Sequence, residues 1–347
     1  MTSGGSDLSK LLDAHGRQSL AIDLSDIEYH PNDILGHGAQ GRVYKARYMG
    51  MHVALKEMLF GGMASNKEAR DSVVRAFARE VDLLSGLHHE NVVRLMGVSR
   101  SSACCYLVTE LCDCSLESVV SKAGGLGGDD NRARWLLYAQ EIGCAMAFLH
   151  AKGVIHRDLK DANVLLDFNG KCKVADFGVS SIGDKLSEGA PMTATMTRGA
   201  GTPLFMAPEV MTGNAGEESS RYSGLVDVYS YGILLWRMWT GKRPFTELSG
   251  NILLLLNHIV GGGRPSLPAS MPPCVCQLVQ SCWHEEPDKR PEFMEINQIL
   301  AGWGDGERFD VVSSTESGST LPRITIAAPH LDESEEIVAI KSWDKGL

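Results

Sequence analysis

The stretch His156–Gly178 reads HRDLKDANVLLDFNGKCKVADFG, and its pattern decides the fold of the chain around it. Residues 164–166 and 172–175 resemble two short strands, and an Asn-Gly pair at 169–170 lies between them. An Asn-Gly pair between two strands favours a tight turn. The stretch therefore predicts a β-hairpin.

Three polar side chains flank this hairpin: Asp158 and Asn163 lie before it, and Asp176 follows it. We expect the hairpin to hold all three side chains near one of its ends. Phosphoryl transfer needs such a set, because one carboxylate can orient the attacking hydroxyl and the other oxygen atoms can hold Mg²⁺ on the phosphates. The stretch therefore predicts a phosphoryl-transfer site.

Composition limits the classes of protein that fit. The chain has 347 residues, enough for one large domain or two small lobes with a sizeable core. A formal net charge of −10 argues against nucleic acid or an anionic membrane as the main partner. The apolar run 252–256 is far too short to insert across a membrane.

The nine cysteines indicate reduced thiols. Their count is odd and no signal peptide precedes them, so we expect a cytoplasmic, intracellular setting. A zinc site is the alternative. The spacings are C-C and C-x-C rather than paired C-x-x-C, and no His pair follows, which favours ordinary buried thiols.

Short strands are expected from Tyr29 onward, after a flexible N-terminal extension of residues 1–28. Glycines stand at 36, 38 and 41, and alternating runs at 42–48 and 52–58 follow them. A second strand after the glycines, instead of a helix, favours a lid whose backbone amides approach phosphates. The alternative is a plain hairpin turn.

The remaining pattern separates a strand-rich first lobe from a helical second lobe. Apolar residues at helical spacing predict a helix over 72–87, with Glu80 in its middle. Further expected elements are strands at 92–98 and 106–111, a helix over 132–151, a helix capped by Ser223 and running to Thr240, and helices to about residue 303. The helix ending at Thr240 is apolar on nearly every face, so we expect it at the centre of its lobe.

These motifs resemble the eukaryotic protein kinases from about residue 34 to residue 300. They occur in the family's order: Gly36-x-Gly38-x-x-Gly41-x-Val43, Val53-Ala54-Leu55-Lys56, Glu80, His156-Arg157-Asp158 with Asn163, Asp176-Phe177-Gly178, and Ala207-Pro208-Glu209. The resemblance implies an α+β, bilobal kinase fold, with an antiparallel β-sheet and one helix in the N-lobe and a mainly helical C-lobe. The expected domain spans 29–303, with the N-lobe at 29–111 and the C-lobe at 112–303.

The resemblance also implies a role for each matching residue. Lys56 would bind the α- and β-phosphates of ATP while pairing with Glu80, although a surface ion pair is the alternative. Asp158 would accept or orient the substrate hydroxyl, and Lys160 would lie near the γ-phosphate. Asn163 and Asp176 would hold Mg²⁺, with Mn²⁺ as a substitute. Asp227 would bond the backbone near Asp158, and Glu209 would pair with Arg290.

The nucleotide-binding residues follow from the same resemblance. The three glycines would cover the phosphates, and Val43, Ala54 and Leu165 would enclose the adenine ring. Thr109 would be the gatekeeper, and the hinge that pairs with adenine would comprise Glu110, Leu111 and Cys112. Gln40 departs from the aromatic residue usual at the tip of the glycine loop, which predicts weaker shielding of the phosphates from water.

The hydroxyl class follows from motif details. Lys160, and Gly201-Thr202-Pro203 ahead of Ala207, are similar to serine/threonine kinases. Gly232–Trp236 and the segment 282–293 are similar to tyrosine kinases instead. Such a mixture is typical of the tyrosine-kinase-like group, which includes Raf-like and mixed-lineage kinases, and predicts a serine/threonine kinase. A tyrosine or dual-specificity kinase is the alternative.

Arg157 beside Asp158 implies control by phosphorylation of the loop over 180–198, by an upstream kinase or by autophosphorylation in trans. The candidate threonines are Thr193, Thr195, Thr197 and Thr202, with Thr195 or Thr197 favoured as the switch. Such control suits signal transduction through protein substrates.

The tail over 304–347 carries nine acidic and four basic residues and is expected to be disordered. A short docking helix over 331–343 is the alternative for part of it. The main rival for the whole chain is a pseudokinase scaffold. Degraded motifs would favour that rival, and every lysine, base and metal position is intact in this sequence.

Overall fold

The structure is a computed structural model, which describes residues 18–38, 41–59, 77, 80–101, 104–177, 181–182, 203–212, 220–248 and 251–303. Several predictions fall outside these residues. They concern Gln40, Gly178, the threonines at 193, 195, 197 and 202, and the tail over 304–347.

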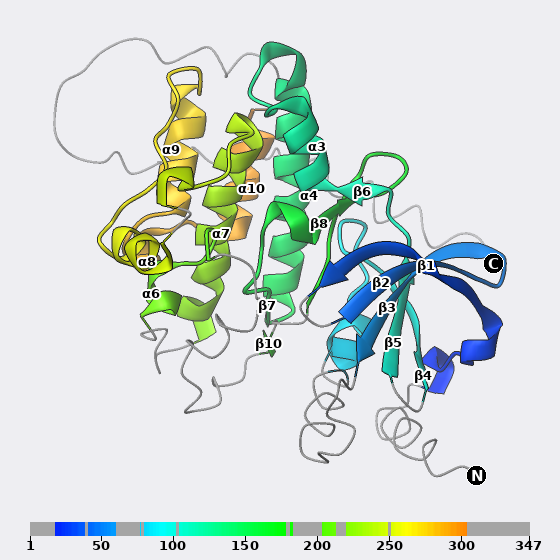
Figure 1. Cartoon of the computed structure of the whole chain (residues 1–347). Coiled ribbons are helices and arrows are strands. Elements are labelled where there is room, and N and C mark those ends of the chain that lie inside the picture. The colour runs from blue at the N-terminus through cyan, green and yellow to red at the C-terminus, as the bar shows by residue number, and fades with distance from the viewer. Residues whose placement is uncertain are drawn as a thin grey trace, which may run out of the picture. The chain divides into compact units, whose positions relative to one another are not determined.

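A five-stranded antiparallel sheet forms the N-lobe, with strand order β1-β2-β3-β5-β4 (Figure 1). Its strands are β1 (Ile27–Gly38), β2 (Gly41–Tyr48), β3 (Met51–Leu59), β4 (Leu95–Arg100) and β5 (Cys104–Glu110). Alternation along β3 buries Val53 and Leu55 on one face of the sheet, while Ala54 and Lys56 point to the other face and stay half-buried. The predicted antiparallel N-lobe sheet is confirmed.

The strand predicted over 92–98 begins three residues late, at Leu95. Val92 forms a parallel bridge with Val174 instead. The Val93 amide donates to the Val174 carbonyl over 2.9 Å, and the Val174 amide donates to the Asn91 carbonyl over 2.8 Å. The backbone groups of 91–93 are therefore used by the C-lobe, which leaves them unavailable to the N-lobe sheet.

Residues 18–28 are ordered against the sheet, so the prediction of a flexible extension is wrong for this part of 1–28. The segment contains two short 3₁₀ turns, η1 (Gln18–Leu20) and η2 (Leu24–Asp26). Ala21 forms a parallel bridge with Val98, and the Ile22 amide donates to the Val98 carbonyl over 2.8 Å. Gly97 makes room for this contact, because a Cβ at that position would lie 2.4 Å from Ile22 Cδ1.

The C-lobe is mainly helical. Its helices are α3 (Leu116–Ala123), α4 (Arg132–Ala151), α6 (Pro208–Met211), α7 (Ser220–Thr240), α8 (Ile252–Val260), α9 (Pro273–Cys282) and α10 (Phe293–Ala301). Single 3₁₀ turns are η4 (Asp129–Asn131), η5 (Asp161–Asn163), η6 (Thr246–Leu248) and η7 (Pro287–Lys289). Of the helices in the described part of the chain, none is long and apolar enough to cross a membrane.

The predicted central hairpin is confirmed. It consists of β8 (Val164–Leu166) and β9 (Cys172–Val174), which pair antiparallel, and β6 (Cys114–Ser115) joins β8 on its other side. Gly170 has a φ of 80°, the left-handed conformation that the turn requires. A second small sheet joins β7 (Val154–Ile155) to β10 (Ser181–Ile182).

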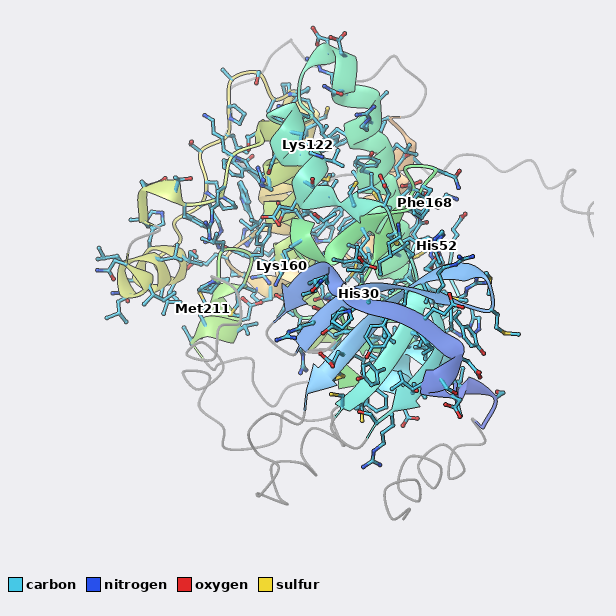
Figure 2. The ribbon with its side chains drawn as sticks, turned by 45° about the vertical axis from the view of Figure 1, so that its right-hand side comes forward. His30, His52, Lys122, Lys160, Phe168 and Met211 are labelled. Carbon is cyan, nitrogen blue, oxygen red and sulfur yellow. The ribbon has the colours of Figure 1, made fainter. Side chains whose placement is uncertain are left out.

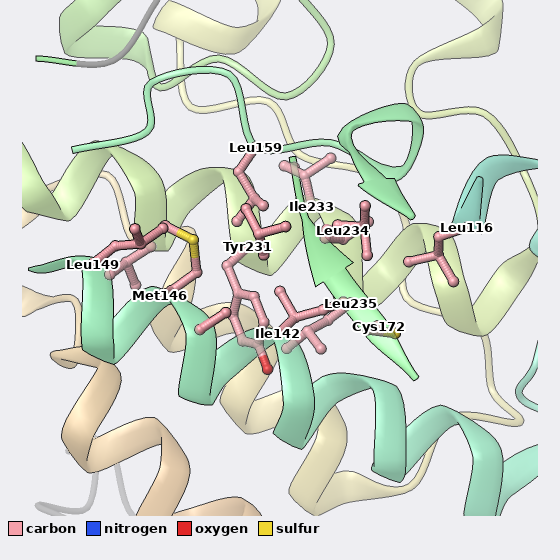
Figure 3. Packing of buried hydrophobic residues seen from close by; sticks show 14 of the residues in the cluster. Leu116, Ile142, Met146, Leu149, Leu159, Cys172, Tyr231, Ile233, Leu234 and Leu235 are labelled. Carbon is pink, nitrogen blue, oxygen red and sulfur yellow. The ribbon is translucent and has the colours of Figure 1, made fainter. Parts of the chain in front are cut away.

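The α7 helix lies at the centre of the C-lobe core, as its all-round apolar pattern predicts. Tyr231, Ile233, Leu234 and Leu235 are fully buried and pack near α4 and the hairpin (Figure 3). The helix begins at Ser220 and not after Ser223, since residues 220–222 include no proline or glycine to stop it. Leu159 is fully buried in the same core, and it directly follows Asp158 in the chain.

The Gly-rich segment 124–128 is built into the C-lobe. The Leu126 amide donates to the Met238 carbonyl over 2.8 Å, and the Leu126 side chain is fully buried. A Cβ at Gly127 would lie 2.4 Å from Nε1 of Trp239. Glycine is needed in this segment because the backbone approaches the end of α7 so closely.

Replacing Ile22 by Ala will lower the free energy of unfolding by about 2–4 kcal/mol, because it empties a buried site against β4. Chemical denaturation followed by fluorescence measures the change. The control is Glu28→Ala, at an exposed position of β1, which should leave stability within about 0.5 kcal/mol of the wild type. Equal stability of the two variants would mean that burial of Ile22 against β4 contributes nothing to stability.

Candidate active site

The loop between β7 and β8 is held by one buried carboxylate on α7. Asp227 is fully buried; its Oδ1 accepts the Arg157 amide over 2.7 Å and its Oδ2 accepts the His156 amide over 2.8 Å. Burial opposes charge on Asp227, but His150 at 2.9 Å and the neighbouring amides outweigh it and lower the pKa of this carboxyl. Asp227 therefore fixes the backbone from which Asp158 projects.

Asp158, Lys160 and Asn163 form a compact polar group on this loop. Lys160 Nζ lies 2.6 Å from Asp158 Oδ2, and Asn163 Nδ2 donates to the same oxygen over 2.8 Å. Asn163 Nδ2 also donates to the Asp158 carbonyl over 2.8 Å. The half-exposed Asp158 carboxylate is thus oriented by two donors. Figure 2 places Lys160 on the loop of the C-lobe near the strands of the N-lobe.

Lys56 of β3 joins the N-lobe to Asp176, the residue that follows the central hairpin. Its Nζ lies 2.9 Å from Glu80 Oε1 and 3.0 Å from Asp176 Oδ1. Glu80 lies in the helical segment over 80–85 and its side chain is only 4% exposed, which rules out the alternative of a surface pair. Burial by itself would lower the pKa of the Lys56 ammonium, but the charges of Glu80 and Asp176 outweigh burial and raise its pKa.

Asn163 and Asp176 carry side-chain oxygen atoms, which are suitable ligands for a hard cation such as Mg²⁺. The Ala175 amide donates to the Asn163 carbonyl over 2.9 Å, which keeps the two residues on neighbouring strand ends. Because Asn163 Nδ2 is engaged by Asp158, the amide oxygen is the atom of Asn163 that can ligate a metal. Across the described residues, no group of three or more His, Cys, Asp or Glu could hold a metal. Phosphate oxygens and water are the ligands that usually complete the coordination of a protein-bound Mg²⁺.

Three of the expected nucleotide-binding residues are glycines at the end of β1 and the start of β2. The paired glycines meet where β1 turns into β2, with Gly36 opposite Val43 and Gly38 opposite Gly41. Gly41 cannot carry a side chain, since a Cβ there would lie 1.7 Å from the Glu57 carbonyl oxygen. Glycine is therefore required at this position by the close approach of the β3 backbone.

The expected gatekeeper and hinge residues lie at the end of β5 and directly after it. Thr109 stands opposite Ala54 in the register of β3 and β5, and both are half-buried. Leu165 of β8 is half-buried as well. Burial and the neighbouring charge of Glu110 raise the pKa of the Cys112 thiol to about 12, so it stays a neutral thiol at physiological pH. All nine cysteines are free.

The model of the protein kinase domain matches residues 29–300. The chain belongs to the protein kinase family. It is 34% identical over 281 residues to a probable serine/threonine-protein kinase of Dictyostelium discoideum, covering 80% of this chain and 28% of that protein. It is 34% identical over 283 residues to the dual specificity protein kinase shkD of the same organism, covering 79% and 35%.

A serine/threonine-protein kinase of Arabidopsis thaliana is 31% identical over 298 residues, which cover 84% of this chain and 48% of the plant protein. The chain therefore spans less than half of the length of each of these three relatives. The matched region is in each case the size of the kinase domain described above. The relatives include both serine/threonine and dual-specificity kinases by name.

Two ion pairs with little exposed surface hold elements of the C-lobe together. Arg290 Nη1 lies 2.5 Å from Glu209 Oε1 and its Nη2 lies 3.0 Å from Glu209 Oε2, the pair that the resemblance implies. The second pair joins Arg237 Nε of α7 to Asp161 Oδ2 over 2.9 Å, with both side chains at most 8% exposed. Arg237 also bonds Ser121 Oγ over 2.8 Å and the Gly241 carbonyl.

Sequence reasoning missed the pair of Arg237 and Asp161. A signal was available, because Arg237 interrupts a helix that is apolar on nearly every face, and a buried cation needs an anionic partner. Asp161 lies in η5, between Lys160 and Asn163. The pair therefore ties the turn that carries those two residues to α7 and α3.

Replacing Arg237 by Met will lower the free energy of unfolding by about 3–5 kcal/mol, because it leaves Asp161 charged, buried and unpaired. Calorimetry and denaturant titration measure the loss. The double variant Arg237→Met with Asp161→Leu should regain a large part of it, since no charge is then stranded. A double variant as unstable as the single one would show that the lost bonds to Ser121 and Gly241, and not the stranded carboxylate, cause the effect.

Proposed function

We propose that this chain transfers the γ-phosphoryl group of ATP to serine or threonine hydroxyls of protein substrates. One observation carries the proposal. Lys56 pairs with both Glu80 and Asp176. The central hairpin of β8 and β9 connects Asp176, which follows it, to the group of Asp158, Lys160 and Asn163, which precedes it. The names of the serine/threonine-kinase relatives support it.

Each group has a part in the reaction. Asp158, held by Lys160 and Asn163, orients the attacking hydroxyl and accepts its proton. Lys56, held by Glu80, binds the α- and β-phosphates, and Lys160 stabilises charge on the transferred group. Mg²⁺, or Mn²⁺ in its place, would be held by Asn163 and Asp176 and would neutralise phosphate charge. The glycines at 36, 38 and 41 cover the phosphates, and the hinge at 110–112 binds adenine.

Asp158→Asn and Asp176→Asn should each lower phosphate transfer by about 10²-fold or more, because the first loses the base and the second a metal ligand. Transfer of labelled phosphate from Mg-ATP to a general protein substrate measures this. Asp129→Asn, at an exposed position of η4, is the matched control and should keep full activity.

Phosphoamino-acid analysis of the labelled product then gives the hydroxyl class. We expect label on serine and threonine. Label on tyrosine as well would establish the dual specificity that the relative shkD has by name. Absence of transfer by the wild type would favour the scaffold function over the enzyme.

Control of activity through the loop over 180–198 is a second part of the proposal. Arg157 is half-buried beside Asp158, has a φ of 64°, and burial lowers the pKa of its guanidinium. A nearby phosphate would stabilise this cation. Autophosphorylation in trans and an upstream kinase are both compatible with the proposal. The mixture of motifs supports a tyrosine-kinase-like member acting inside the cell on signalling substrates.

The double variant Thr195→Ala with Thr197→Ala should lose most of the activity that prior incubation with ATP produces, because no phosphate then reaches Arg157. Rates measured before and after such incubation test this. Thr193→Ala is the control and should be activated normally. An unchanged activation of the double variant would sink the assignment of the switch to Thr195 or Thr197.

A further inference from the structure

Lys173 of β9 makes two contacts that no motif accounts for. It lies three residues before Asp176, and its side chain is 11% exposed. Its Nζ lies 3.0 Å from Glu110 Oε1 and 3.0 Å from the carbonyl oxygen of Glu90. A buried ammonium needs such partners, and their identity gives Lys173 a place in the proposed reaction.

The first partner, Glu110, begins the proposed hinge. Its Oε1 accepts the Arg94 amide over 2.8 Å as well as contacting Lys173, and its own amide donates to the Arg94 carbonyl over 3.0 Å. The Glu110 carboxylate is thus fixed at one oxygen by two donors from different elements. Its backbone continues directly into Leu111 and Cys112, so the position of the side chain constrains the hinge.

The second partner, Glu90, lies in the segment that follows the helical residues 80–85. This segment is already joined to β9, because the Val174 amide donates to the Asn91 carbonyl over 2.8 Å. One ammonium therefore connects the strand that leads to Asp176, the segment after Glu80 and the first residue of the hinge.

We propose that Lys173 is a positioning residue for the nucleotide: its ammonium fixes Glu110 and so aligns the hinge backbone that pairs with adenine. The inference rests on the proposed function. Asp158 and Lys160 lie on a different loop, held by Asp227, so loss of Lys173 weakens nucleotide binding while the chemical step is kept. Such a change appears as a higher KM for ATP at nearly constant kcat.

Lys173→Met keeps an apolar stem of similar length and removes the charge. We expect roughly a 5- to 10-fold rise in KM for ATP, with kcat within about 2-fold of the wild type. The affinity for ADP, measured by calorimetry, should fall by the same factor.

Lys171→Met is the matched control. Lys171 lies two residues earlier and pairs with the side chain of Glu90 over 2.5 Å, and both side chains of this pair are exposed. Its removal should leave both KM and ADP affinity unchanged.

A double-mutant cycle tests the link to Glu110. Glu110→Gln keeps an acceptor for the Arg94 amide and removes the charge that Lys173 meets. If Lys173 acts through Glu110, the double variant with Lys173→Met will have nearly the KM of either single variant. If the rise in KM of the double variant equals the product of the two single-variant rises, the two residues act independently and the inference is overturned.

Failure of the inference is distinguishable from failure of the proposed function. A wild type that neither binds ADP nor transfers phosphate would sink the proposed function. An active wild type with unchanged KM and ADP affinity in Lys173→Met would sink the inference alone. If Lys173→Met does not fold, Lys173→Gln, which keeps a neutral donor, should show the rise in KM, and normal KM in that variant also overturns the proposal.

Discussion

The buried carboxylate of Asp227 is the constraint on which the rest of the site depends. It lies inside the apolar α7, where an unpaired charge would be costly, so its two oxygens must find donors. The amides of His156 and Arg157 supply them. Because these amides belong to the loop that carries Asp158, satisfying one buried charge sets the backbone position of the proposed base.

The same principle recurs around the site at Arg237 with Asp161, Arg290 with Glu209, and Lys173 with Glu110. In each pair the charged side chains are largely shielded from water. They can make their hydrogen bonds only when the two elements that carry them are correctly placed. Such pairs add little net stability compared with apolar packing of the same volume, but removing one partner is costly. Their value here is that they fix loops between rigid helices and strands, which places polar groups for chemistry.

The polar loop is also held from its apolar side. Leu159 is fully buried in the core formed by α4, α7 and the hairpin, so the residue after Asp158 is anchored by packing while Asp158 itself stays half-exposed. A buried residue next to an exposed one in a loop allows the hydrophobic core to fix the exposed side chain, which stays accessible to substrate. Residues 18–28 extend the packed region beyond the family match, which begins at residue 29.

The sequence by itself determined the local elements and the identity of the polar residues. The hairpin around Asn169-Gly170 and the helix over 132–151 follow from turn chemistry and apolar periodicity, which act between neighbours in the chain. The order of motifs was enough to predict the kinase family and the α+β fold.

Tertiary structure decided the features that depend on distant partners. Residues 92–93 pair with β9 instead of extending β4, and residues 20–22 pack on Val98 and Gly97. Arg237 and Lys173 find their carboxylates across 76 and 63 residues of chain. Local periodicity contains no information on such contacts, because burial and charge pairing are settled only when separate elements meet.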